Sequence, residues 1–290
     1  MKFMELSLKK VKKTIAEKGY LKLKNISHLT SVKKLEEKVL NRLNKPLYIK
    51  RPKRMSNNLY LAKDLKGPQI NLPHYLHKKI LNKGYGHYKN YTNSITFNQP
   101  LLNFKECHSL VFNEKVMKYA SIILGKPAKL GFVALSCLMD NKLPKNDINY
   151  LHTDDISNSK VVEKNRLVKF TIPISTNAKY HNEYHHLPIS KLKLKNKIKQ
   201  YSDLNEIPKI LKNKIVSPKI KNVDGMFFDP DNFFHLAAKP KKKIRIILYV
   251  VYIKEGNYLV KKAKNLKIKK KEFLKLPNHF KQFAKFLKKV

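Results

Sequence analysis

Several residue types are scarce in this 290-residue chain, and each scarcity removes a class of protein. Only two cysteines occur, Cys107 and Cys137, and they form no C-x-x-C pair. Neither a disulfide framework nor a cysteine-based zinc site is therefore expected. No apolar run approaches the roughly 20 residues that span a bilayer, and the MKFMELSLKK start becomes charged too early for the apolar core of a signal peptide. These absences predict a soluble protein of the cytoplasm.

Acidic residues are also scarce: 20 Asp and Glu stand against 63 Lys and Arg, a formal net charge of +43. Such a charge predicts attraction to nucleic acid, an anionic membrane surface or an anionic small molecule. However, only five of the 63 are arginine, which leaves 58 lysines spread along the chain. Proteins that read base edges depend on the planar fork of arginine. A solvated, lysine-rich surface is thus the favoured interpretation; nucleic acid is not a favoured partner, although the charge would help to recruit an anionic substrate.

The apolar content is that of a globular protein, with 42% hydrophobic and 10% aromatic residues and no internal repeat. Apolar residues at helical spacing predict helices over residues 5–18, 30–43 and 113–124. Thr30 or Ser31 would cap the second helix and Asn113 the third, which Gly125 would end. Residues 51–100, polar and rich in Pro and Asn, are expected to form irregular cover.

Short runs rich in β-branched and aromatic residues predict strands at 129–139, 167–175, 225–229 and 244–253. Residues 192–214 are expected to be helical with a break at Pro208, and an amphipathic helix is expected from Pro277 onward, using Phe280, Phe283 and Leu287. The whole pattern predicts a single α+β domain whose sheet is a sandwich or barrel. Its expected parts are a mainly helical N-terminal cover (1–128), a strand core (129–255) with a helical insert (192–222), and a helical tail (256–290).

The stretch NYLHTDDIS at 149–157 carries a candidate metal-binding pair, His152 and Asp154. Residues i and i+2 at a strand end point to the same side, so this pair can offer two ligands to one ion. Non-haem Fe(II) oxygenases bind their ion through two histidines and one carboxylate on one face, which leaves three positions open. His235, which follows the strand at 225–229 and a turn, is the candidate third ligand.

Arg245 lies ten residues after His235, in the apolar run IRIILYVVYI. A permanently charged guanidinium in such a run needs a buried partner. A small dicarboxylate would supply one through paired hydrogen bonds. Since lysine is the usual cation of this chain, the use of arginine here indicates a specific role.

Plainer interpretations remain for these residues. Alone, His152 and Asp154 would cap backbone groups at a turn, and Asp229 lies beside the turn former Pro230. A rival His-x-acid motif occurs at His181–Asn182–Glu183 and is followed by His185 and His186. Its polar surroundings favour a solvent-exposed or substrate-facing loop over a metal site.

The order His152-x-Asp154, His235, Arg245 resembles that of the phytanoyl-CoA dioxygenase family of Fe(II)/2-oxoglutarate oxygenases. EKGYLKLKNISHLTSVKKLEEKV at 17–39 is similar to the family's opening helix, extended piece and second helix. FTIPISTNAKYHNEYHHLPISK at 170–191 is similar to the strand and loop that follow the His-x-Asp, and DGMFFDPDNFFHLAA at 224–238 to the segment with the distal histidine.

The resemblance implies a double-stranded β-helix, a jelly-roll or cupin-like barrel flanked by N-terminal helices and a C-terminal helix. It implies that His152, Asp154 and His235 bind Fe(II), that Arg245 binds the distal carboxylate of 2-oxoglutarate, and that Thr171 offers a hydroxyl to the same cosubstrate. With O₂ as second cosubstrate, the implied activity is a dioxygenase that hydroxylates a C–H bond of a small-molecule or lipid-like substrate.

Departures from the family pattern concern the contacts around the site. LPIS at 187–190 lacks the Gly and the following His of the family loop, and Ala237 stands where members often carry Ser. Asp154 is retained, which speaks against the halogenating branch. The alternative function is a polybasic protein on the same fold that binds nucleic acid or an anionic surface without catalytic iron. A third possibility keeps the iron and acts on a macromolecule docked on the lysine surface.

Overall fold

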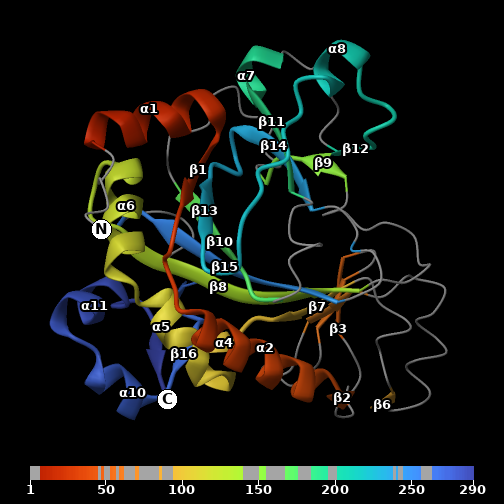
Figure 1. The fold of residues 1–290 in the computed structure, drawn as a ribbon. Helices are drawn as coiled ribbons and strands as arrows, with labels where there is room; N and C mark the ends of the chain where they lie inside the picture. The colour runs from red at the N-terminus through yellow and green to blue at the C-terminus, as the bar shows by residue number, and fades with distance from the viewer. Residues whose placement is uncertain are drawn as a thin grey trace.

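The computed structural model describes residues 7–44, 94–139, 150–154, 167–175, 184–194, 201–237, 240, 244–255 and 263–290, together with five short strands between residues 47 and 86. Two antiparallel sheets organise the fold (Figure 1). The large sheet has nine strands in the order β1 (Tyr20–Leu23), β13 (Gly225–Phe228), β10 (Leu167–Pro173), β15 (Arg245–Ile253), β8 (Lys129–Leu138), β7 (Ser94–Phe97), β5 (Gln69–Asn71), β4 (Leu59–Leu61) and β3 (Lys53–Ser56). The small sheet has four, in the order β11 (Tyr184–Ser190), β14 (Phe233–Ala237), β9 (Leu151–His152) and β12 (Tyr201–Ser202).

Two further strand pairs lie outside these sheets: β2 (Leu47–Tyr48) with β6 (Tyr85–Gly86), and β16 (Lys267–Ile268) with β17 (Lys288–Lys289). The helices are α1 (Leu8–Lys18), α2 (Leu29–Asn44), α4 (Pro100–Asn103), α5 (His108–Val111), α6 (Glu114–Leu124), α7 (Lys191–Leu194), α8 (Lys209–Lys212), α10 (Lys270–Lys275) and α11 (Asn278–Phe283), with a 3₁₀ turn at Lys105–Cys107. In Figure 1, α6 and α11 lie on the side of the large sheet away from β11 and β14. No helix of the described residues is long and apolar enough to cross a membrane.

Strand alternation divides the apolar side chains into layers. Along β15, Ile246, Leu248 and Val250 join the large cluster beneath the helices. Ile247 points the other way and packs with residues of both sheets, such as Met226. Because side chains two apart in a strand share a face, Arg245 also faces the space between the sheets. A third cluster covers the outer side of the small sheet, beneath α7 and α8.

Gly19 joins the N-terminal helix to the hairpin that carries His235. It ends α1 in the left-handed region, with φ of +74°, and its carbonyl accepts a hydrogen bond from Asp229 at 3.0 Å. A Cβ at Gly19 would lie 2.4 Å from the Phe233 ring. Only glycine therefore allows both this backbone conformation and the close packing of the hairpin.

Most expected elements of the N-terminal helices and core strands are present. The helices at 5–18, 30–43 and 113–124 correspond to α1, α2 and α6; Asn113 accepts from Val116 at 3.0 Å, and Gly125 ends α6. The N-cap of α2 was placed wrongly. The helix begins at Leu29, and Val32 donates to the His28 carbonyl, so Thr30 and Ser31 lie within the first turn. The four core strands occur as β8, β10, β13 and β15.

Three other expectations were wrong. Residues 51–100 were expected to be irregular, but they contribute five strands, four of them in the large sheet. Within 192–214, the residues that the structure describes form the end of α7, β12 and the four-residue α8. The helix expected from Pro277 onward is only α11, six residues long, and the chain then enters β17, although Phe280, Phe283 and Leu287 are buried as expected. Antiparallel sheets with helices are thus confirmed, whereas no closed barrel is seen among the described strands.

Candidate metal centre

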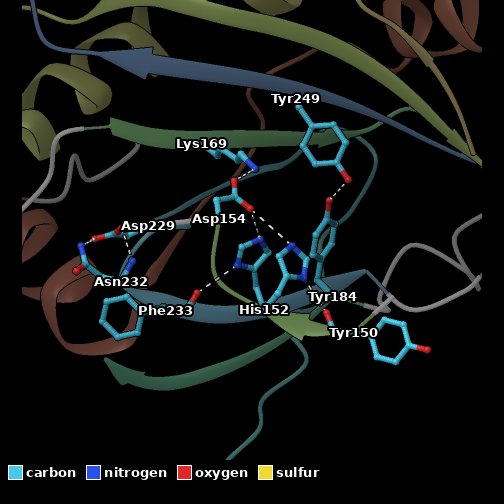
Figure 2. Close-up of polar contacts among 10 residues, drawn as sticks. Tyr150, His152, Asp154, Lys169, Tyr184, Asp229, Asn232, Phe233 and Tyr249 are labelled. Atoms are coloured by element: carbon cyan, nitrogen blue, oxygen red, sulfur yellow. Dashed lines mark hydrogen bonds and ion pairs between the residues drawn. The ribbon is translucent and has the colours of Figure 1, made fainter. Parts of the chain in front are cut away.

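Potential ligand atoms of His152, Asp154 and His235 lie together, and Figure 2 shows His152 and Asp154 pointing toward each other. His152 ends β9 and lies opposite His235 of β14 in the antiparallel register, so both imidazoles project from neighbouring strands toward the same side. Asp154 follows two residues after His152, and its Oδ1 atom lies 3.6 Å from the Nε2 of His152 and 3.4 Å from the Nε2 of His235. One potential ligand atom of each residue lies within 4.8 Å of the others.

Hydrogen bonds set the tautomer of both imidazoles. The Nδ1 of His152 lies 2.7 Å from the Tyr150 carbonyl, and the Nδ1 of His235 lies 3.2 Å from the Phe233 carbonyl. A carbonyl oxygen only accepts, so each Nδ1 must carry the proton. The unprotonated Nε2 lone pairs are then left for a ligand, which is the usual orientation of metal-binding histidines.

The surroundings of Asp154 favour its ionised form. Burial alone would raise the pKa of the carboxyl, but the Lys169 ammonium and the adjoining imidazoles outweigh it and hold the pKa well below its usual value. Burial lowers the pKa of His235. An ionised carboxylate beside a neutral imidazole is the protonation state that a metal ion requires. The Asp154 backbone N–H donates to Pro230 at 2.8 Å and so anchors the end of β9 to the hairpin before His235.

These three residues fit a six-coordinate divalent ion. Metal–nitrogen and metal–oxygen distances of about 2.0–2.2 Å place ligands at right angles about 3 Å apart. The observed 3.4 and 3.6 Å would have to contract by only a few tenths of an ångström. The donor set, two imidazoles and one carboxylate on one side, is the one that leaves three positions open.

Arg245 lies at the start of β15 with only 2% of its surface exposed. None of its three guanidinium nitrogens has a hydrogen-bond partner among the described residues. Its guanidinium carbon lies 5.8 Å from the ring centroid of Tyr184, whose hydroxyl donates to that of Tyr249 at 2.7 Å. Burial raises the pKa of both tyrosines. The charge of Arg245 lowers these pKa values and the charge of Asp154 raises them. The tyrosine pair thus lies close to both the guanidinium and the candidate metal site.

A buried cation without a partner is costly, and in a folded protein it indicates a missing anion. Five N–H donors in a planar fork match a carboxylate in bidentate geometry. The chemistry of this position therefore fits a dicarboxylate with one end near the metal candidate and the other at Arg245.

Thr171 is not placed beside Arg245. It lies on β10 opposite Tyr249, four residues along β15, which corresponds to about 13 Å of strand. Its hydroxyl donates to the Met226 carbonyl at 3.4 Å. The hydroxyl of Thr171 thus already has a hydrogen-bond partner, on the neighbouring strand β13.

Two residues of the centre were not expected there from the sequence. Lys169, on the inner face of β10, forms an ion pair with Asp154 (Figure 2). His186, expected in an exposed or substrate-facing loop, instead lies on β11 opposite His235; it is fully buried, and neither ring nitrogen has a partner among the described residues. Its ring stacks against that of His235 at 6.0 Å between centroids. The rival motif itself, residues 181–183, lies outside the described residues.

Comparisons with known proteins give a fold but no family. No protein-family profile and no curated protein sequence matches this chain. Among solved structures, it is similar to the non-heme alpha ketoglutarate dependent epimerase SnoN from nogalamycin biosynthesis, with a TM-score of 0.52 and 11% identity over 85% of this chain and 82% of SnoN. EctD from S. alaskensis, solved with 2-oxoglutarate and 5-hydroxyectoine, has a TM-score of 0.51 and 14% identity over 87% of this chain and 77% of EctD. HygX from Streptomyces hygroscopicus, solved with nickel and 2-oxoglutarate, has a TM-score of 0.50 and 8% identity over 87% of this chain and 88% of HygX. At these identities the likeness shows a shared fold.

Proposed function

We propose that this chain is an Fe(II)- and 2-oxoglutarate-dependent dioxygenase that hydroxylates a C–H bond of a small-molecule or lipid-like substrate. The observation that carries the proposal is a buried guanidinium with no hydrogen-bond partner among the described residues, on the large sheet and facing the space between the sheets, where a His–Asp–His cluster also lies. A metal site alone would not require Arg245, and neither would a surface that only binds polyanions.

The proposal includes a family and a fold. We assign residues 1–290 to one domain of the phytanoyl-CoA dioxygenase type, with the two antiparallel sheets as the halves of a double-stranded β-helix. Support comes from the order of His152, Asp154, His235 and Arg245 along the chain and from the shared fold of SnoN, EctD and HygX. EctD and HygX were each solved with 2-oxoglutarate, the dicarboxylate that suits Arg245.

Each residue has a defined task in this proposal. His152, Asp154 and His235 would hold the metal from one side, and Arg245 would bind the carboxylate of 2-oxoglutarate farther from the metal. Iron and 2-oxoglutarate supply the oxidising chemistry, in which O₂ and 2-oxoglutarate yield hydroxylated product, succinate and CO₂. Apolar residues of both sheets, among them Met226 and Phe228, exclude water around the reacting groups. Thr171 remains a candidate second contact to the cosubstrate.

The first test needs no substrate. Anaerobically purified protein should bind one Fe(II) per chain and then 2-oxoglutarate, and in air with ascorbate it should release succinate. The His152→Ala/His235→Ala double variant should lose metal and succinate formation together. A matched control, His28→Ala/His279→Ala, removes two exposed histidines and should behave as the wild type does. Iron retained at full stoichiometry by the first double variant would overturn the site assignment.

A further inference from the structure

Lys169 brings a positive charge into the candidate metal centre from the large sheet. It is the charged residue of the run LVKFTIP in β10, where it lies opposite Phe228 on one side and Val251 on the other. Its side chain is 23% exposed, and its ammonium lies 5.8 Å from the Phe228 ring centroid. Its ammonium ends at the carboxylate of Asp154.

The two oxygens of Asp154 have different partners. Oδ1 faces the Nε2 atoms of His152 and His235, while Oδ2 forms the ion pair with Lys169 (Figure 2). A carboxylate can bind a metal through one oxygen or through both. With Oδ2 held by an ammonium, only Oδ1 is directed at the position between the imidazoles.

The number of oxygens that Asp154 donates decides how many coordination positions stay open. Two imidazoles and one carboxylate oxygen occupy three of six positions and leave three. Two carboxylate oxygens would leave two, which a chelating 2-oxo acid would fill completely. One-oxygen binding by Asp154 is therefore what keeps a position for O₂.

We propose that Lys169 is a positioning residue that holds Asp154 in one-oxygen coordination and thereby sets both metal affinity and the number of open positions. The proposal rests on the function proposed above. In this role Lys169 acts on the metal through Asp154, with which it forms an ion pair. The backbone hydrogen bond from Asp154 to Pro230 fixes the other end of the same residue, so both its main chain and its distal oxygen are held.

Cobalt(II) binding to metal-stripped protein tests this without turnover. Calorimetry gives the affinity, and the visible absorption of bound Co(II) reports its coordination number and geometry. Lys169→Met should bind Co(II) about 10–100-fold more weakly, the usual effect of removing a group that orients a metal ligand, and its Co(II) spectrum should change. Lys169→Arg, which keeps a cation and its hydrogen bonds, should restore both values to near those of the wild type.

The direction of the change separates positioning from simple charge. Loss of a nearby positive charge would by Coulomb's law tighten the binding of a divalent cation, whereas loss of an orienting partner weakens it. Lys285→Met is the matched control, because it removes a lysine–carboxylate ion pair, with Glu255, on another part of the chain. Lys169→Gln, which keeps a hydrogen-bond donor, provides a second variant if the methionine variant unfolds, as judged by circular dichroism.

Unchanged or tighter Co(II) binding by folded Lys169→Met or Lys169→Gln, with an unchanged spectrum, would overturn the role of Lys169. The proposed function would survive that result, because the wild type would still bind metal. If the wild type itself bound no Co(II), the proposed function would fail and the role of Lys169 with it.

Discussion

Replacement of Arg245 by methionine should raise the stability of the ligand-free protein and lower its affinity for 2-oxoglutarate. The guanidinium is 2% exposed, and none of its nitrogens has a partner among the described residues. A buried polar group without a partner costs about 1–3 kcal/mol, and a charged one more. The ligand-free Arg245→Met protein should therefore be more stable than the wild type by at least about 1 kcal/mol. Urea denaturation of the two proteins measures this difference.

The same substitution should remove the stabilisation by 2-oxoglutarate. Two hydrogen bonds to a charged group contribute about 1.5–3 kcal/mol each, so their loss weakens binding by about 3–6 kcal/mol, or 10²–10⁴-fold. At a concentration 100 times the Kd, 2-oxoglutarate stabilises the wild type by about 2.7 kcal/mol. The variant should gain about 0.4 kcal/mol or less at that concentration.

Both measurements are made on metal-loaded protein under anaerobic conditions, with succinate as a ligand that lacks the 2-oxo group. Arg42→Met, a substitution on α2, is the control and should change neither value. The reasoning about Arg245 would be refuted if Arg245→Met bound 2-oxoglutarate as tightly as the wild type. A ligand-free variant of much lower stability would show that the guanidinium has a partner in the protein itself.

Three further predictions concern the surroundings of the site. Gly19→Ala should destabilise the protein by about 2–5 kcal/mol, from about 1–2 for the positive φ and about 1–3 for overpacking against Phe233; thermal unfolding measures it, and an unchanged Tm would contradict the close packing. Burial raises the pKa of Asp229 to about 6, so its contribution to stability is complete below about pH 4 and is lost as the pH rises through 6. Asp229→Asn should remove that loss, which amounts to about 3 kcal/mol of stability between pH 4 and 7. Urea denaturation midpoints of both proteins over this pH range measure it, and a parallel fall in the two midpoints would contradict the prediction. His186→Leu should stabilise the ligand-free protein by about 1–3 kcal/mol, because both ring nitrogens lack partners among the described residues; a lower urea midpoint would refute this.

Local sequence signals predicted the elements that depend on local physics. The α6 helix has its Asn113 cap, apolar stripe and Gly125 stop within a dozen residues, and all three are confirmed. Cap residues of similar chemistry misled at α2, where the helix begins one residue before Thr30. The strands at 51–100 were missed because polar residues with Pro and Asn carry little alternation. Four of them, β3, β4, β5 and β7, extend the large sheet from β8 by successive pairing.

Only the tertiary structure placed Lys169 and His186 at the candidate metal centre, although the sequence carries a weak signal for each. Lys169 interrupts an apolar strand and shares a face with Thr171, but it is one of 58 lysines in a chain of 63 basic residues with five arginines. His186 is two residues from Tyr184 in a segment that reads as polar loop, and only its pairing with β14 buries it opposite His235.

By itself, the sequence determined the candidate ligands, their order and the presence of an arginine in an apolar strand, because a charge in an apolar run and a His-x-Asp pair can both be read from short stretches of sequence. Only the tertiary structure decided that residues 83 positions apart, His152 and His235, face each other across one strand pair. It also decided which lysine holds Asp154 and that the guanidinium has no partner among the described residues. Such distances depend on how two sheets pack, and sheet packing is a sum over many weak contacts that no short stretch of sequence contains.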